Sequence, residues 1–178
     1  MRQILFLLSS SRPDGNSARL ARRAAPAGAA CHWLDLATLG LPPFHDTRPA
    51  PPPPLAPVVA GVLAQMRSAD DLVFVAPVYW YALPAPAKLL LDHWSGWLDD
   101  PDLGFAAMMA GKRLWLITTR ADPDPDVPAP VEATMARTAL WLKMPWCGAL
   151  HGVADAPGDI TRDTATWAQA AEFLTLRQ

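Results

Sequence analysis

A hydroxyl-rich segment at residues 9–17, Ser-Ser-Ser-Arg-Pro-Asp-Gly-Asn-Ser, carries the strongest chemical signal in this chain. It directly follows the apolar run 4–8 and directly precedes a helical pattern that begins at residue 17. A buried strand, a hydroxyl-rich turn and a helix in this order suit an anion, because free backbone N–H groups and the helix dipole both favour negative charge at a helix start. The serine hydroxyls and the Arg12 guanidinium would add further donors. The segment therefore predicts a phosphate site.

The same residues allow another interpretation and exclude two common ones. The segment has neither the G-x-x-x-x-G-K-[ST] spacing of a nucleotide P-loop nor the G-x-G-x-x-G spacing of a dinucleotide fold. A serine-rich turn can also serve only to cap its own helix, with Asn16 or Ser17 as the N-cap residue. Taken alone, the segment leaves phosphate binding and helix capping as alternatives.

A second informative segment contains three consecutive aromatic residues, Tyr79, Trp80 and Tyr81, just after the apolar run 72–76. Such a cluster can simply seal the edge of a core. Aromatic faces and stiff backbone donors at the mouth of a parallel sheet also suit a flat ring ligand. Together with a phosphate site one strand away, the cluster favours a ligand with a phosphate at one end and a flat heterocycle at the other. Flavin mononucleotide (FMN) fits this description.

The elements that must position these segments alternate between strand and helix. Apolar runs predict strands at 4–8, 31–36, 72–76, 112–119 and 146–153, and helical spacing predicts helices at 17–25, 57–68, 85–98, 129–142 and 161–176. The proline-rich stretch 39–54 predicts a stiff connecting loop, in preference to a ligand for an SH3-type domain. Apolar strands that alternate with helices predict a parallel sheet covered on both faces, with ligands beyond the carboxyl ends of the strands.

Composition limits the classes of partner. The chain is 51% hydrophobic and 18% charged, as expected of a single globular domain over residues 1–178. A net charge of -2 gives no reason to expect nucleic acid or an anionic membrane as a partner. No run is long enough for a membrane span or a signal peptide, so we expect a cytoplasmic protein. Cys31 and Cys147 have no metal-binding spacing, so we expect buried thiols and no metal site.

The chain resembles a known family, the flavodoxin-like NAD(P)H-dependent FMN and quinone reductases. The resemblance extends over roughly residues 3–120, and the order of the elements continues it to the end. Its motifs are Ser10-x-Arg12-x-x-Gly15-Asn16-Ser17, similar to the phosphate loop of the family, and Pro77-x-Tyr79-Trp80-x-x-x-Pro84-x-x-x-Lys88-x-x-x-Asp92, similar to its second flavin segment, with Asp70 and Gly111-Lys112 also matching.

The resemblance implies a flavodoxin-like, doubly wound, five-stranded parallel sheet of order 2-1-3-4-5, with helices on both faces. It implies FMN as cofactor and NAD(P)H as co-substrate. The implied reaction is ping-pong electron transfer to a small-molecule acceptor (a quinone, azo compound or flavin) in a homodimer. No catalytic side chain is expected, because the flavin carries the chemistry. The implied flavin contacts are Ser10, Arg12, Asn16 and Ser17 at the phosphate, Pro77, Val78, Tyr79, Trp80 and Tyr81 at the ring, and Thr118, Thr119 and Arg120 after the fourth strand.

The segment after the fourth strand departs from the family pattern. The family often has Thr-Gly-Gly there, whereas this chain has Thr118-Thr119-Arg120. Arg120 would crowd the space that a glycine pair leaves for the flavin or nicotinamide, or would pair with an anionic flavin or a pyridine-nucleotide phosphate. Two alternative functions stay open: an electron carrier without NAD(P)H turnover and, because of the altered segment at Arg120, a relative that has lost flavin binding.

Several side chains have more than one expected role. Lys88 and Asp92 are expected to orient their helix. His151, after the fifth strand, could approach the substrate pocket, but a surface or capping role is favoured. The apolar residues Trp94, Trp97 and Leu98, with the run 105–109, could form either a dimer interface or core.

Overall fold

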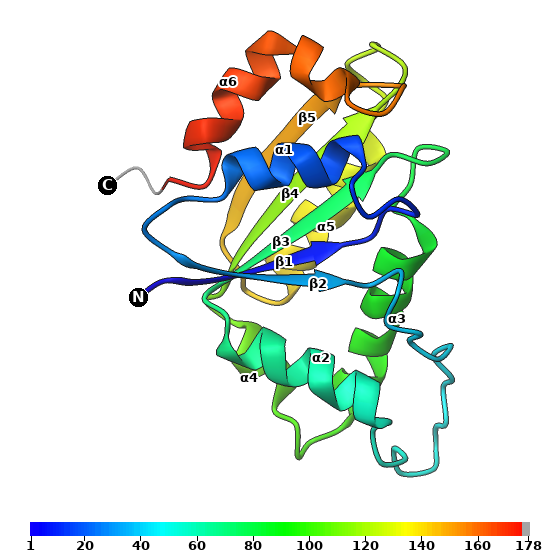
Figure 1. The fold of residues 1–178 in the computed structure, drawn as a ribbon. Helices are drawn as coiled ribbons and strands as arrows, with labels where there is room; N and C mark the ends of the chain where they lie inside the picture. The colour runs from blue at the N-terminus through cyan, green and yellow to red at the C-terminus, as the bar shows by residue number, and fades with distance from the viewer. Residues whose placement is uncertain (176–178) are drawn as a thin grey trace.

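Five parallel strands form one sheet in the order β2-β1-β3-β4-β5, with helices on both sides (Figure 1). This computed structural model describes residues 1–175. The strand order confirms the predicted doubly wound topology. The strands are β1 (Gln3–Leu8), β2 (Ala30–Asp35), β3 (Asp71–Pro77), β4 (Arg113–Arg120) and β5 (Trp146–Val153). The helices are α1 (Asn16–Ala24), α2 (Pro57–Ser68), α3 (Ala85–Asp99), α4 (Phe105–Met109), α5 (Ala129–Trp141), the 3-10 turn η1 (Asp159–Arg162) and α6 (Thr164–Phe173).

The central strands are apolar throughout because they are buried on both faces. On β1, Leu5 and Leu7 belong to the core that α2, α3, α4 and α5 cover. Ile4, Phe6 and Leu8 point to the opposite face, into the core shared with α1 and α6. Because successive strand residues alternate between faces, a continuous apolar run supplies both cores at once.

One predicted helix differs from the structure, and one helix of the structure was not predicted. The helix expected over 161–176 is divided into η1 and α6, because the Asp163 carboxylate accepts the backbone N–H of Thr166 at 3.1 Å and starts a new helix there. Residue 176 lies outside the described part of the chain. The short helix α4 was not predicted, since five residues are too few to show a helical period.

The aromatic side chains that could have formed an interface lie in the core of the chain. Trp94 and Trp97 are 3% and 2% exposed, and Phe105 of α4 packs against both rings at centroid distances of 5.6 and 5.2 Å. Leu98 packs partly buried against the same core. Helix α4 therefore packs against the second half of α3.

A buried carboxylate links residues at the amino-terminal ends of the strands. Asp71 is fully buried and accepts hydrogen bonds from Arg2 at 2.7 and 2.8 Å, from Arg113 at 2.6 and 2.7 Å, and from Trp115 Nε1 at 2.7 Å. Burial by itself would raise the pKa of Asp71, but these hydrogen bonds outweigh it and lower the pKa to about 2. The network lies at the opposite end of the strands from the predicted ligand site.

Other motif residues also have structural contacts. Lys88 and Asp92 form an ion pair one turn apart on the exposed side of α3. The Lys112 ammonium donates to the Arg67 carbonyl at 2.9 Å and to the Ala69 carbonyl, which closes the end of α2. Both cysteine thiols are partly buried, and burial raises the pKa of each. Within residues 1–175, no helix combines the length and the apolar character that crossing a membrane requires.

Candidate functional site

The carboxyl ends of β1, β3 and β4 bring the two predicted motifs together. The Ser9 N–H donates to the Val75 carbonyl at 3.0 Å, and the Val78 N–H donates to the Thr119 carbonyl at 2.8 Å. Beyond the strands, the hydroxyl groups of Ser11 and Tyr79 lie 3.2 Å apart and are hydrogen-bonded. Segments that are 68 residues apart in the sequence therefore form one continuous surface at this end of the sheet.

The first motif forms a tight loop that ends at an uncapped helix. The Gly15 N–H donates to the Arg12 carbonyl at 3.1 Å, and the Arg12 N–H donates to Ser10 Oγ at 3.1 Å. A Cβ at residue 15 would lie 3.1 Å from the Arg12 carbonyl oxygen and 3.2 Å from Ser10 Oγ, so a larger residue there would have to displace these neighbours by a few tenths of an ångström. Gly15 is the N-cap residue of α1, and no side chain caps the helix.

This geometry leaves a set of hydrogen-bond donors without partners. Among residues 1–175, the first-turn N–H groups of Asn16, Ser17 and Ala18 make no hydrogen bond, and neither do the Ser17 hydroxyl nor the Arg12 guanidinium. Ser10, Arg12 and Ser17 line one small hollow beside the ends of β1, β2 and β3, which the Asp35 side chain also borders. Since the predicted caps, Asn16 and Ser17, do not cap the helix, the geometry favours an anion site over helix capping.

The Asn16 side chain is directed elsewhere. Its amide nitrogen donates to the Ala156 carbonyl at 2.9 Å, and its Oδ1 accepts the Gly158 N–H at 2.9 Å. The loop between β5 and η1 is therefore part of this site. Sequence reasoning missed the loop because no local pattern reports a hydrogen bond across 142 residues.

The second motif is a strained two-residue hairpin. Tyr79 and Ala82 exchange backbone hydrogen bonds at 3.1 and 3.0 Å, and Trp80 and Tyr81 between them have φ values of 51° and 62°. Positive φ at both central positions is the pattern of a type I′ turn, which normally selects Asn and Gly. Such a conformation in bulky residues costs energy and is concentrated at functional sites.

The hairpin directs aromatic groups and backbone donors to solvent. Trp80 is 93% exposed and Tyr81 58%, and their backbone N–H groups have no hydrogen-bond partner among residues 1–175. Pro77 and Val78 form its partly buried base, where Val78 is already bonded to β4. The free groups are therefore at the tip, beside the first motif.

The end of β4 forms the floor of the site. Thr118 and Thr119 are buried, and the Thr118 hydroxyl is hydrogen-bonded to His151 Nδ1 at 2.7 Å. His151 Nε2 in turn lies 2.9 Å from the Glu132 carboxylate of α5, so His151 links β4, β5 and α5. The Arg120 guanidinium donates to the carbonyls of Asp124 and Pro123 at 3.0 and 3.3 Å, in its own loop. Arg120 thus has structural partners that the sequence did not indicate.

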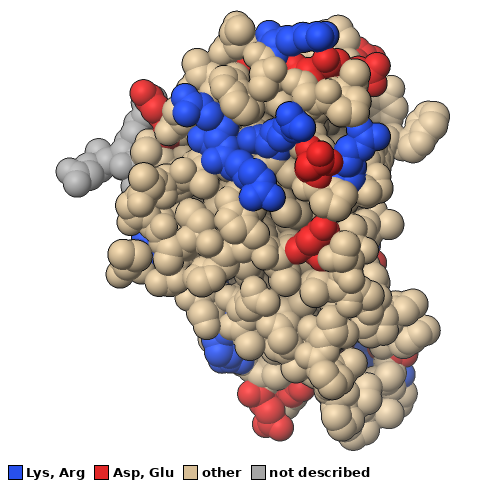
Figure 2. All heavy atoms as spheres, in the orientation of Figure 1, with Lys and Arg blue, Asp and Glu red and all other residues tan. Residues whose placement is uncertain are grey.

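Positive charge gathers over α1 although the whole chain is slightly acidic. Figure 2 shows Lys and Arg side chains clustered over α1, whose exposed positions include Arg19, Arg22 and Arg23. Arg19 lies in the first turn and donates to the Asp14 carbonyl at 3.1 Å. Arg22 and Arg23 belong to the last turn of α1, so of these three side chains Arg19 is the one near the helix start.

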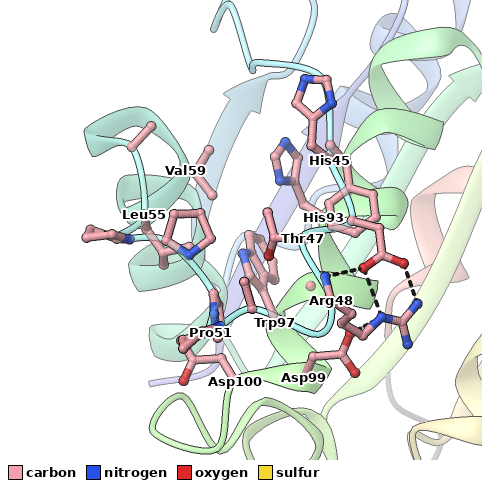
Figure 3. Close-up of a pocket in the computed structure, with 18 of the residues that line it drawn as sticks. His45, Thr47, Arg48, Pro51, Leu55, Val59, His93, Trp97, Asp99 and Asp100 are labelled. Atoms are coloured by element: carbon pink, nitrogen blue, oxygen red, sulfur yellow. Dashed lines mark hydrogen bonds and ion pairs between the residues drawn. The ribbon is translucent and has the colours of Figure 1, made fainter.

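A larger cavity, of about 610 Å³, lies between the proline-rich loop and the end of α3 (Figure 3). Arg48 pairs there with Asp46 at 2.6 Å and with Asp99 at 3.4 Å, and His93 Nε2 is hydrogen-bonded to the Pro42 carbonyl at 2.8 Å. The loop is therefore packed on its own domain, as a connector would be. None of the residues predicted to contact a ligand lines this cavity.

Comparisons with known proteins identify the family and the fold of this chain. Residues 2–123 match the model of the NADPH-dependent FMN reductase family. A Bacillus subtilis protein provisionally named NAD(P)H-dependent FMN-containing oxidoreductase YwqN is 26% identical over 97% of this chain and 96% of its own. The structure of the Trp repressor binding protein from Bacillus subtilis has a TM-score of 0.78 at 21% identity, covering 99% of each chain. A Klebsiella pneumoniae protein provisionally described as a quinone reductase has a TM-score of 0.70 at 16% identity, covering 100% of this chain and 86% of its own.

The strand order, with helices on both faces of the sheet, defines a flavodoxin-like α/β fold. The chain belongs to the NADPH-dependent FMN reductase family. FMN is accordingly its cofactor and NAD(P)H its electron donor.

Proposed function

We propose that this protein passes electrons from NAD(P)H, by way of FMN, to a quinone, azo compound or flavin with ping-pong kinetics. The observation that carries the proposal is the pairing of two features at one sheet edge. An uncapped helix start with free donors lies beside a strained aromatic hairpin with free backbone N–H groups. A phosphate with an attached flat ring fits this pairing better than either feature alone.

The phosphate end of FMN fits the first motif. The N–H groups of residues 16–18, the Ser10 and Ser17 hydroxyls and the Arg12 guanidinium would hold it, because these donors otherwise lack partners or, for Ser10, keep a free hydroxyl hydrogen. The Gly15 curl keeps this cradle open, since a Cβ there would press on the Ser10 hydroxyl. The Asn16 side chain is not included, because hydrogen bonds to Ala156 and Gly158 orient its amide toward the loop after β5.

The ring end fits the second motif. The backbone of residues 77–81 would meet the ring edge, and the side chains of Tyr79 and Trp80 would flank it. Thr118 and Thr119 would form the floor, because the Thr119 carbonyl holds Val78 in place. We assign Arg120 to its own loop rather than to the cofactor, since its guanidinium is bonded to two loop carbonyls.

Bound FMN supplies the redox chemistry, accepting a hydride and passing two electrons onward. The side chains of this site position and shield the reactants, and no nucleophile or general base is required. We propose that NAD(P)H leaves before the acceptor enters, because one exposed face beside the hairpin would serve both. A cytoplasmic location, a single domain and a homodimer stay predictions; sedimentation equilibrium would show the homodimer as twice the chain mass of 19.3 kDa.

Fluorescence titration of FMN tests the phosphate assignment. We expect Arg12→Ala to weaken FMN binding by roughly tenfold or more, the effect of losing a charge-assisted hydrogen bond. Ser17→Ala should weaken it by roughly threefold to tenfold, since it removes a single hydroxyl donor. Arg23→Ala is the matched control, because Arg23 is an exposed arginine in the last turn of the same helix. Equal affinities for all three variants and the wild type would contradict the assignment.

A further inference from the structure

The loop between β5 and η1 is joined to the phosphate motif through one side chain. Asn16 makes three hydrogen bonds to this loop: Nδ2 to the Ala156 carbonyl at 2.9 Å, and Oδ1 from the N–H groups of Gly158 at 2.9 Å and Ile160 at 3.5 Å. Its carbonyl oxygen thus accepts two bonds and its Nδ2 donates one of its two hydrogens, so these bonds fix the orientation of the amide. The side chain acts as a strut between two backbone segments.

The loop that receives Asn16 is itself rigid. The Asp159 carboxylate accepts the Ala156 N–H at 2.9 Å, and the Asp159 N–H donates to the Ala156 carbonyl at 3.1 Å. Ile160 is fully buried in the core that α1 shares with α6. Gly158 has φ 92°, a conformation that allows its N–H to reach Asn16 Oδ1 and that other residues adopt only with strain. Because this loop is held in the core, its hydrogen bonds to Asn16 can hold the first turn of α1 in one position.

Asn16 is also the first residue of α1, directly after the N-cap Gly15. The donors proposed for the phosphate are the N–H groups of this same first turn. Their direction depends on where the first turn lies relative to the sheet, and the strut fixes that point. Small displacements of preorganised donors weaken the binding of an anion, because the geometry of each hydrogen bond degrades.

We propose that Asn16 is a positioning residue rather than a phosphate ligand, and that residues 156–160 are a structural half of the phosphate site. This inference rests on the proposed function, because it requires FMN to bind at the start of α1. Breaking the strut from either side should therefore loosen the phosphate end of the cofactor and leave the ring end unaffected.

Two variants break the strut from its two sides. Asn16→Ala removes all three hydrogen bonds from the helix side. Gly158→Ala acts from the loop side, since alanine is strained at φ 92° and the loop must shift. Gly28→Ala is the matched control, because Gly28 has open space around a Cβ and no positive φ. Thermal unfolding of each apoprotein would show that the variants remain folded.

The measurement compares FMN with riboflavin, which has the same ring and no phosphate. We expect both strut variants to weaken FMN binding by roughly tenfold, as for loss of about one well-formed hydrogen bond to a charged group, while riboflavin affinity stays within about twofold of the wild type. The double variant should be no weaker than the single variants, because both break one connection. Gly28→Ala should match the wild type for both ligands.

Different outcomes would overturn the inference. If Asn16→Ala weakens FMN binding and Gly158→Ala does not, Asn16 is a direct ligand. If both variants weaken riboflavin and FMN equally, the strut supports the fold in general and not the phosphate site. If wild-type protein binds FMN no more tightly than riboflavin, the proposed phosphate site itself fails, which is a separate result.

Discussion

At the scale of single residues, arginines have different roles at the amino-terminal and carboxyl-terminal ends of the strands. Arg2 and Arg113 are bound to the buried Asp71, whereas the guanidinium of Arg12, at the opposite ends of the strands, makes no hydrogen bond or ion pair with residues 1–175. A cation with a buried partner contributes to folding, and a cation without one is available for an anionic ligand. We therefore infer that the amino-terminal ends of the strands contribute to stability and that the carboxyl-terminal ends bind the cofactor.

Asp71 should make stability depend on pH. Its folded-state pKa, about 2, lies below the value of roughly 3.9 expected in an unfolded chain. The ionised form is therefore favoured by folding, and its contribution is present above the unfolded pKa and lost as the pH falls through the folded one. We expect the network to supply about 2 to 3 kcal/mol of the free energy of unfolding near pH 7, most of it lost by pH 2.

Urea unfolding of Asp71→Asn at several pH values checks this expectation. The variant should be about 3 kcal/mol less stable at pH 7, because two arginines lose their shared partner. It should also lose less stability than the wild type does between pH 5 and pH 2. Asp70→Asn is the control, since the neighbouring Asp70 is exposed and accepts a backbone N–H of Gln3. The same pH dependence in Asp71→Asn and wild type would contradict the assignment.

At the scale of elements, the hairpin after β3 is less stable than it would be with other residues at its two central positions. Asparagine and glycine are the residues that suit its two positive φ values, yet Trp80 and Tyr81 occupy them. A protein that keeps exposed aromatic groups in a strained turn sacrifices stability for the position of those groups. We interpret the hairpin as a preformed platform for the flat ring.

Substitution of Trp80 separates strain from stacking. Trp80→Ala removes the indole but keeps a Cβ at φ 51°, whereas Trp80→Gly removes both. Both variants should weaken FMN binding if the indole flanks the ring. The glycine variant should unfold with a free energy about 1 kcal/mol higher than the alanine variant, because left-handed backbone is costly for residues with a Cβ. Urea unfolding measures this difference, and an alanine variant at least as stable as the glycine variant would show that the turn is unstrained.

The sequence predicted these elements well where the pattern is local. The strands β1, β3 and β4 are recognisable as continuous apolar runs because both of their faces are buried. The residues of both motifs follow the ends of these strands, as the strand order requires. The partners of Asn16, Arg120 and His151 were not predictable, because each depends on how far a loop folds back onto a helix or strand. Helix α4 was missed for a different reason, since it is shorter than the periods that reveal a helix.

At the scale of the whole molecule, the two cores on either side of the sheet have distinct roles. One core, under α1 and α6, supports the phosphate loop and the segment that holds Asn16. The other, under α2 to α5, supports the hairpin through α3 and the floor through β4. The cofactor would lie across the sheet edge where both cores end, so its binding should depend on the integrity of the complete domain.

The most direct test of this account is the visible spectrum of the protein with added FMN, followed by NADPH in the absence of oxygen. We predict that FMN binds, and that NADPH then bleaches the flavin band completely, with colour restored on addition of a quinone. Binding without bleaching would contradict the proposed NAD(P)H-linked reaction. A protein that leaves the FMN spectrum unchanged would contradict the assignment of both motifs.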